Sequence, residues 1–159
     1  MLIYLLVILL ILIFQVHLLS LPEGEFRDEI EVWYLRIVCC VLVLLAALRG
    51  STVGTDTIAY IEDYNNMPLL SFADVLEEKA DYPGYYLLAK ICSLFHLPVQ
   101  ILFGIVAGIY IYAIYKFVNE FSEEKLYSVL CFTMIGLYSF SLAGLKQTLS
   151  MTWGSRPIT

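Results

Sequence analysis

The sequence predicts an all-α protein: a polytopic integral membrane helix bundle of four to five helices, with interfacial helices in one loop. Hydrophobic residues make up 60% of the 159 positions and charged residues only 15%. The mean hydropathy of +0.81 is far above that of water-soluble domains. No charge occurs before Glu23, and further long apolar runs follow, separated by polar segments. A soluble enzyme is therefore excluded.

The charged residues and the cysteines exclude other classes. Nine Lys and Arg against fifteen Asp and Glu give a net charge of −6, and no basic run occurs, so nucleic acid is not an expected partner. The four cysteines lie in apolar runs without metal-ligand spacing, and we interpret them as apolar filler. We expect no metal site, no disulfide framework and no cofactor. These cysteines are Cys39, Cys40, Cys92 and Cys131.

Two spans are expected before the first large loop. A helix over residues 1–21 would cover about 33 Å, enough for a hydrocarbon layer of ~30 Å. A cleaved signal peptide is the alternative, but the segment lacks a basic start and a small-x-small cleavage site. An acidic linker from Pro22 to Glu31 precedes the second expected span, residues 32–48, in which Arg36 can snorkel from near one end.

Residues 49–82 form the only sizeable polar loop. Ser71 and Asp74 resemble a capping box, which predicts a short helix through Ala80. An earlier short helix, from Asp56 or Thr57 as the cap to about Asn65, is predicted as well. Both helices are expected to lie along the membrane interface.

The spacing of the tyrosines in the earlier of these helices indicates which face it buries. Tyr60 and Tyr64 are four residues apart and therefore share one face, while Glu62 and Asp63 are expected to point elsewhere.

Pro83 suits the first turn of a third helix, residues 83–97. This segment covers only ~22 Å, which is short for a span, so a re-entrant segment and a tilted helix both stay open. Lys90 lies in its middle. Because a lipid-facing ammonium group costs roughly 3 kcal/mol, Lys90 should face protein or water, either in a structural pairing or bound to a substrate or lipid phosphate.

Two further spans are expected, residues 98–117 and 126–145. Gly104 and Gly108 form a GxxxG pair in the first of them, which predicts close contact with another helix. With no internal repeat, we predict a single transmembrane domain over residues 1–153. The final residues, 154–159, are predicted to be an irregular tail.

The segment from Arg49 to Thr57 combines a guanidinium group, two glycines, several hydroxyls and a carboxylate. Such a loop suits an oxyanion: Arg49 offers a two-pronged fork for phosphate, and Asp56 could accept a proton or hold a sugar hydroxyl. In the alternative interpretation, Arg49 anchors a helix end at the headgroups, the glycines make a turn, and Asp56 caps the next helix.

Three motifs, in order along the chain, resemble the EpsG/Wzy-type polysaccharide polymerase family. Their order and spacing match the family pattern through nearly the whole chain. They are Arg49 with Val53-Gly54-Thr55-Asp56 and Tyr60, then Pro83-Gly84-Tyr85-Tyr86-Leu87-Leu88 with Lys90, and last Ser141-Leu142-Ala143-Gly144-Leu145-Lys146-Gln147.

The resemblance implies a membrane glycosyltransferase-like polymerase that joins lipid-linked oligosaccharide repeat units for capsule, exopolysaccharide or O-antigen. It implies a multi-pass protein of the bacterial inner membrane, with undecaprenyl-pyrophosphate-linked oligosaccharide as donor and other polysaccharide assembly proteins as partners. The chemistry needs a cation for the leaving pyrophosphate and a carboxylate for the acceptor hydroxyl. The implied catalytic residues are Asp56 and Arg49, and the implied substrate-binding residues are Lys146, Gln147, Lys90 and Tyr60.

Two departures from the family pattern lead to alternatives. Lys146 replaces the usual Arg and so lacks the planar fork, and the family has further helices, so we expect an incomplete N-terminal fragment. A polysaccharide or lipid transporter component, using Lys90 and the GxxxG helix, is one alternative, and an inert truncated membrane protein is another. The flanking charges do not decide the orientation, but the resemblance puts the 49–82 loop on the extracytoplasmic side.

Overall fold

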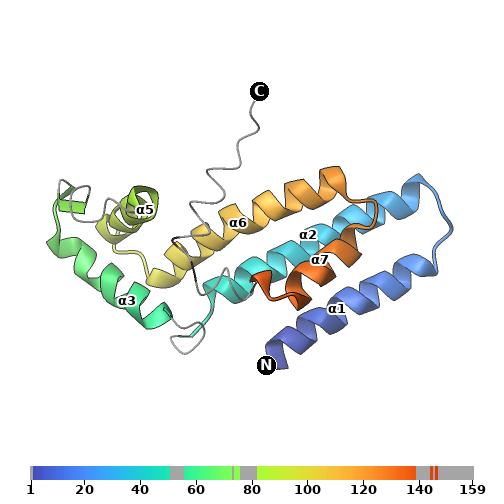
Figure 1. The fold of residues 1–159 in the computed structure, drawn as a ribbon, viewed down its shortest axis with the longest axis horizontal. Helices are drawn as coiled ribbons and strands as arrows, with labels where there is room; N and C mark the ends of the chain where they lie inside the picture. Colours follow the sequence, from blue (N-terminus) through green and yellow to red (C-terminus); the bar gives the residue numbers. More distant parts are fainter. Residues whose placement is uncertain are drawn as a thin grey trace. The chain divides into compact units, whose positions relative to one another are not determined.

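The computed structural model describes residues 2–50, 56–72, 74–75, 82–138, 144 and 146. In these residues every regular element is a helix and no strand occurs, which confirms the all-α class. Figure 1 shows the helices in chain order. They are α1 (Leu2–Leu19), α2 (Glu25–Ala47), α3 (Thr57–Asn66), the short 3₁₀ helix η1 (Met67–Leu69), α5 (Pro83–Leu94), α6 (Val99–Phe121) and α7 (Lys125–Met134).

The chain divides into two compact units. The first comprises residues 1–44 and 111–138, and the second comprises residues 45–110 and 139–159. The predicted site residues that the structure describes all belong to the second unit; they are Arg49, Asp56, Tyr60, Lys90 and Lys146.

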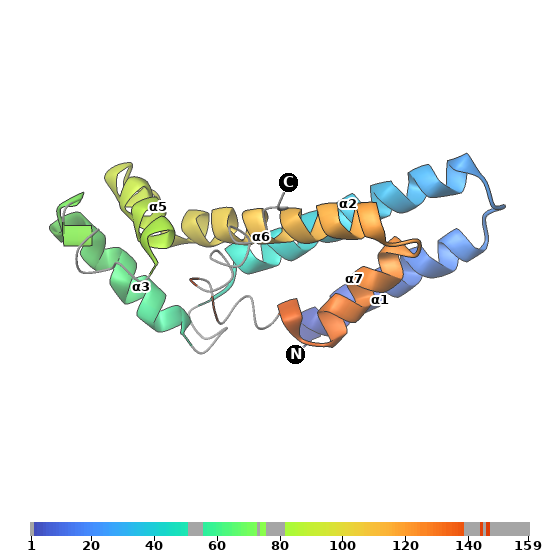
Figure 2. The same cartoon turned by 45° about the horizontal axis from the view of Figure 1, so that its top comes forward.

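In the first unit, α1 and α2 form an antiparallel hairpin, and α7 lies beside α1 in both views (Figures 1 and 2). Leu35, Val38 and Leu42 on α2 are buried at the spacing of one helix face. The hydroxyl of Tyr138 donates a hydrogen bond of 2.7 Å to the Leu42 carbonyl, which ties the segment after α7 to α2.

The acidic linker predicted over residues 22–31 is mostly helical, so that prediction is wrong. The helix α2 begins at Glu25, seven positions before the predicted start of the span at residue 32. Carboxylates in a first turn are favourable because they face the positive end of the helix dipole, and Glu25 and Asp28 occupy that turn. Acidic composition at this place therefore marks a helix start.

In the second unit, α3, η1, α5 and the first half of α6 surround one apolar core. Tyr60 and Tyr64 are both buried in this core, as their spacing predicted. The Tyr64 hydroxyl donates a hydrogen bond of 2.6 Å to the Leu97 carbonyl. The core members are Tyr60, Tyr64, Met67, Val75, Tyr85, Tyr86, Ala89, Cys92, Leu102, Phe103 and Val106.

The capping box of the polar loop is present. The Ser71 backbone N–H donates a hydrogen bond of 2.7 Å to Asp74 Oδ2, and the Asp74 backbone N–H donates one of 3.2 Å to Ser71 Oγ. The rest of the predicted helix, residues 76–80, lies outside the described residues.

Within the described residues, two helices, α2 and α6, are long and apolar enough to cross a membrane by length and composition. Each has 23 residues, with mean hydropathies of 2.2 and 2.0 over an 18-residue window. The third predicted helix, α5, has only 12 residues and covers about 18 Å, so it is short as expected. A Cβ on Gly104 would meet Ala47 Cβ at 3.2 Å, whereas one on Gly108 would meet no described atom within 4 Å, so only the first glycine of the GxxxG pair makes close contact.

The helix predicted without interruption over 126–145 is broken. It ends at Met134, and Gly136 has a φ of +88°, a left-handed conformation that glycine adopts without steric cost. The chain turns there before Leu137. Of the remaining predicted helix, residues 139–143 and 145 lie outside the described part of the chain.

Candidate functional site

The ammonium group of Lys146 lies at the centre of a polar network in the second unit. Its Nζ donates to Asp63 Oδ2 at 3.0 Å and to the Tyr86 hydroxyl. The Tyr86 hydroxyl in turn donates 3.1 Å to the same Asp63 oxygen. A cation, a carboxylate and a phenol are thus joined, from three segments of the chain.

Three tyrosine rings surround the same ammonium group. Nζ lies 5.3 Å from the ring centroid of Tyr60, 5.7 Å from that of Tyr85 and 4.6 Å from that of Tyr86. Each distance is within the range of a cation–π contact. We call Arg49, Tyr60, Asp63, Tyr85, Tyr86 and Lys146 the tyrosine–lysine cluster.

Local sequence explains how α3 and α5 supply these groups. Tyr60 and Asp63 are three residues apart on α3 and therefore project from one side of the helix. Tyr85 and Tyr86 lie in the first turn of α5, which Pro83 opens at a position where its missing N–H has no cost. Their rings pack edge to face at 5.3 Å.

The surroundings keep Lys146 charged. Burial lowers the pKa of its ammonium group, but the hydrogen bonds to Tyr86 and Asp63 and the charge of Asp63 raise it by more, so the net pKa lies above the ordinary value. The side chains of Lys146 and Asp63 are 20% and 27% exposed, so this pair lies at the margin of the buried core.

Arg49 brings a second cation to the cluster. It is buried, and its guanidinium carbon lies 4.2 Å from the Phe103 ring centroid. Its positive charge acts on the hydroxyls of both Tyr60 and Tyr85. Arg49 and Lys146, two of the cations predicted from the sequence, therefore both act on Tyr60, and at Tyr85 Lys146 contacts the ring while the charge of Arg49 acts on the hydroxyl.

Tyr60 connects the cluster to Asp56. Burial raises the pKa of Tyr60, a hydrogen bond to the Lys146 backbone lowers it in part, and the charge of Asp56 raises it again. Asp56 is exposed and occupies the N-cap position of α3, as predicted, but its side chain makes no capping hydrogen bond with the described residues. The predicted capping by this carboxylate is therefore wrong.

Lys90 makes a different set of contacts. It is 5% exposed, and its Nζ donates a hydrogen bond of 2.8 Å to the Met67 carbonyl and one of 2.6 Å to the Leu70 carbonyl. Lys90 was predicted to face protein or water, and it faces protein: its contacts pair it with Met67 in η1 and with Leu70, which follows η1. The sixth predicted residue, Gln147, lies outside the described residues.

Asp63 is a site residue that the sequence did not predict, because it was expected to point away from the tyrosine face. Tyr85 and Tyr86 were predicted only as part of a motif, without a role of their own. The signal for Asp63 was its spacing. A residue three after Tyr60 and four before Met67 lies within the width of the same helix face, and both of these neighbours are buried.

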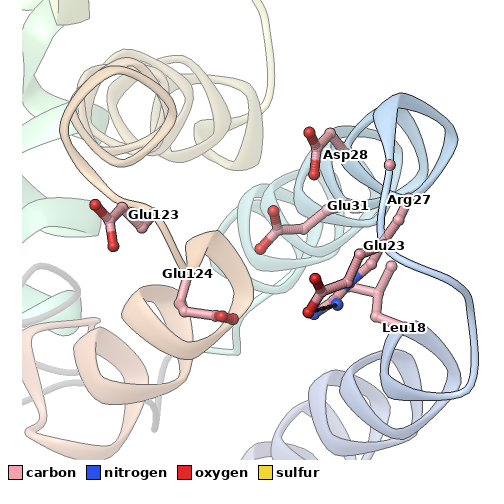
Figure 3. Close-up of a pocket in the computed structure, with 8 residues that line it drawn as sticks. Leu18, Glu23, Arg27, Asp28, Glu31, Glu123 and Glu124 are labelled. Atoms are coloured by element: carbon pink, nitrogen blue, oxygen red, sulfur yellow. Dashed lines mark ion pairs between the residues drawn. The ribbon is translucent and has the colours of Figure 1, made fainter.

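The first unit contains a cavity of about 340 Å³. Figure 3 shows that its lining comes from the end of α1, from the α1–α2 turn, from α2 and from the segment before α7. None of the predicted site residues reaches it, and the residues that the structure describes contain no group of acidic, cysteine or histidine side chains fit to hold a metal ion. The lining residues are Leu18, Glu23, Gly24, Arg27, Asp28, Glu31, Glu123 and Glu124.

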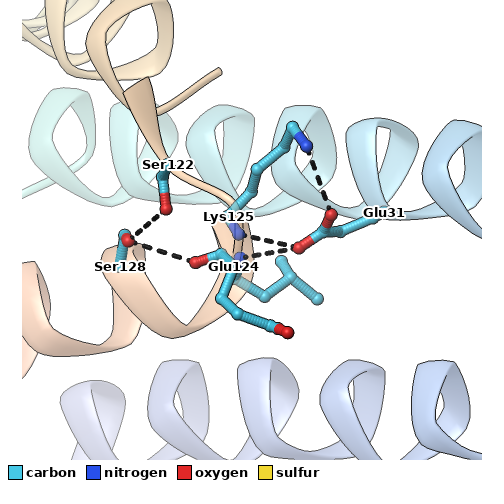
Figure 4. A network of polar contacts seen from close by, with 6 residues as sticks. Glu31, Ser122, Glu124, Lys125 and Ser128 are labelled. Carbon is cyan, nitrogen blue, oxygen red and sulfur yellow. Dashed lines mark hydrogen bonds and ion pairs between the residues drawn. The ribbon is translucent and has the colours of Figure 1, made fainter. Parts of the chain in front are cut away.

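Glu31, in the wall of this cavity, has a structural role at the start of α7. Its Oε1 accepts a hydrogen bond of 2.7 Å from the Lys125 backbone N–H and one of 3.4 Å from the Leu126 backbone N–H (Figure 4). Its Oε2 forms an ion pair of 3.4 Å with Lys125 Nζ. The carboxylate thus caps a helix from a distant part of the chain.

Comparison with known proteins gives a match to a family model. The model described as the EpsG family matches residues 32–152, well over half of the chain. The matched range contains the whole tyrosine–lysine cluster. No curated protein and no solved structure matches the chain.

Proposed function

This chain belongs to the EpsG family, and from this premise we propose that it polymerises lipid-linked oligosaccharide repeat units. Family membership indicates a role related to polysaccharide polymerisation in a membrane context. The finer proposal is a multi-pass glycosyltransferase of the bacterial inner membrane whose product is a capsule, exopolysaccharide or O-antigen chain. Its donor is an oligosaccharide on undecaprenyl pyrophosphate.

The observation that supports this proposal best is the convergence of Arg49 and Lys146 on one group of tyrosines. In the proposed transfer, the acceptor hydroxyl attacks the anomeric carbon of the donor sugar. The bond from that carbon to the diphosphate oxygen breaks, and the diphosphate leaves with the electron pair. Two preorganised cations stabilise the charge that develops on this leaving group.

The proton of the acceptor hydroxyl goes to a carboxylate, for which we propose Asp56. It is exposed and forms no cap with the described residues, and its charge acts on Tyr60 inside the cluster. Asp63 is less suited because its Oδ2 already accepts from Lys146 and Tyr86. Tyr60 is proposed to position the substrate beside Lys146.

The transporter alternative depends on Lys90 and on the GxxxG pair. Lys90 Nζ is engaged by two backbone carbonyls, and Gly108 makes no close contact with the described residues. These two observations favour the polymerase over the transporter.

The test uses a strain in which the gene is deleted and then restored as the parent or a variant. Deletion should remove the long polymer and leave single lipid-linked repeat units, seen as a collapsed ladder on a gel. Arg49→Ala, Lys146→Ala and Asp56→Asn should each lower polymer formation about 10²-fold, the usual cost of losing one preorganised group. Lys116→Ala, an exposed cation on α6, is the matched control and should support normal polymer length.

Normal polymer in the deletion strain would refute the function. Normal polymer with Asp56→Asn would refute the assignment of the proton acceptor alone.

A further inference from the structure

The hydroxyl of Tyr85 is buried without a hydrogen-bond partner among the residues that the structure describes. Tyr85 is only 2% exposed. Its neighbours in the core differ, because Tyr64 donates to the Leu97 carbonyl and Tyr86 donates to Asp63. An unsatisfied buried hydroxyl is unfavourable, and phenylalanine would fill the same space without that penalty. The hydroxyl therefore contributes nothing evident to the fold.

Three charged groups lie around the Tyr85 side chain. The Tyr85 ring centroid lies 5.7 Å from Lys146 Nζ, and the positive charge of Arg49 acts on the hydroxyl. The opposing group is Asp63, whose negative charge also acts on it. At the hydroxyl itself the charge of Asp63 acts more strongly than that of Arg49, so the phenol stays protonated and is available as a hydrogen-bond donor. The formal charges of Arg49, Lys146 and Asp63 sum to +1, and a phosphate oxygen is the kind of acceptor that a donor beside two cations suits.

We propose that Tyr85 is a further substrate-binding residue, whose hydroxyl donates a hydrogen bond to a diphosphate oxygen held between Arg49 and Lys146. The inference rests on the proposed function, because it identifies the diphosphate of the lipid-linked donor as the ligand. The Lys146–Asp63 pair is partly exposed. An incoming phosphate therefore reaches the ammonium group from this margin, accepts its third N–H while Asp63 and Tyr86 keep the other two, and meets the Tyr85 hydroxyl.

The experiment compares the parent, Tyr85→Phe and Tyr64→Phe as full chains purified in detergent. Undecaprenyl diphosphate, inorganic pyrophosphate and undecaprenol are titrated separately, and the melting temperature is measured without ligand. Tyr85→Phe should bind undecaprenyl diphosphate about 5- to 10-fold more weakly, as expected for one lost hydrogen bond, and its melting temperature should be equal to or above that of the parent.

Tyr64→Phe is the matched control. It loses a hydroxyl that has a backbone partner, so its melting temperature should fall while its affinity for undecaprenyl diphosphate stays that of the parent.

The three ligands separate the sources of the phosphate. Weaker binding of both diphosphates by Tyr85→Phe would support recognition of the diphosphate group itself, and weaker binding of only the lipid form would support recognition of a membrane-borne diphosphate. An equal loss of undecaprenol binding would overturn the proposal, as would a melting temperature as low as that of Tyr64→Phe.

The two proposals can fail separately. If Arg49→Ala abolishes polymer formation while Tyr85→Phe binds diphosphate like the parent, the proposed function stands and this inference is wrong. If the deletion strain makes normal polymer, the proposed function is wrong whatever Tyr85→Phe binds.

Discussion

Asp63 and Lys146 form an ion pair of 3.0 Å across 83 positions of the sequence. Tyr86 closes the network by donating to the same carboxylate oxygen that Lys146 contacts. The pair holds a cation in a fixed place among three aromatic rings, and a fixed cation costs less reorganisation when charge develops on a substrate. Asp63 is thus a positioning residue for Lys146.

The first prediction concerns Asp63→Asn. The variant removes the charge that raises the pKa of Lys146, so that pKa should fall. In the parent, the pKa of Lys146 is higher in the folded state than the 10.5 of the unfolded state. The pair therefore contributes its full stability below pH 10.5, and this contribution is lost as the pH rises through the folded-state pKa. Asp63→Asn should lower the free energy of unfolding at pH 7 by about 1 kcal/mol or less, because the pair is partly exposed.

Thermal unfolding in detergent at pH 7 and pH 11 measures this effect. Glu62→Gln is the matched control, since it neutralises the adjacent exposed carboxylate on α3 and should change nothing. Equal melting temperatures for Asp63→Asn and the parent at pH 7 would contradict the prediction.

The second prediction concerns Lys90→Met, which keeps most of the apolar stem and removes the ammonium group. The carbonyls of Met67 in η1 and of Leu70 after it would lose a charged donor, and hydrogen bonds to charged groups contribute a net stabilisation of about 1.5–3 kcal/mol. We expect a loss of about 2 kcal/mol in the free energy of unfolding, measured by thermal unfolding in detergent.

Lys116→Met is the comparison, because Lys116 is exposed on α6. If Lys90→Met were as stable as Lys116→Met, the two carbonyl contacts would have no structural importance.

The parts of the fold that followed from local patterns were predictable. The tyrosine face of α3 followed from a spacing of four, the Ser71–Asp74 box from a spacing of three, and the start of α6 from Pro98. The end of α6, at Phe121, lies four residues past the predicted residue 117. Two boundaries were missed for local reasons as well. Acidic residues at the start of α2 were interpreted as a linker, and the break in α7 depends on one glycine, Gly136, within an apolar run.

The candidate site was predictable in its residue types but only partly in its grouping. The motifs named Arg49, Tyr60 and Lys146, which act on one another in the structure. Lys90 was grouped with them but pairs with backbone carbonyls, and Asp63 was left out although it contacts Lys146. These are contacts between segments distant in sequence, which helical spacing alone does not determine.

The third prediction concerns the pKa of Asp74. The Ser71 backbone N–H and, next, the Ser71 hydroxyl hold that pKa below the ordinary 3.8. The capping box therefore contributes stability above pH 3.8 and loses it as the pH falls through the lower folded pKa. Ser71→Ala should raise the pKa only part of the way, because the backbone donor, which is the larger cause, remains.

Carbon-13 NMR of the Asp74 carboxyl group in the parent and in Ser71→Ala measures both values. A pKa of 3.8 or above in the parent would show that the capping box does not form.

The last prediction concerns Glu31, which caps α7 in place of the neighbouring Glu124. Glu124 occupies the N-cap position but makes no side-chain cap with the described residues, whereas Glu31 Oε1 accepts from the first two backbone N–H groups of α7. Glu31→Ala would leave these buried donors without an acceptor and remove a negative charge from the positive end of the helix dipole. We expect a loss of about 2 kcal/mol in the free energy of unfolding. Glu31→Gln keeps one acceptor oxygen, so its loss of unfolding free energy should be smaller than that of Glu31→Ala. Glu29→Ala is the matched control, because Glu29 is an exposed carboxylate on the same helix, and its stability should equal that of the parent. Thermal unfolding of the three variants in detergent decides the question, since equal losses for Glu31→Ala and Glu29→Ala would show that α7 does not depend on this carboxylate.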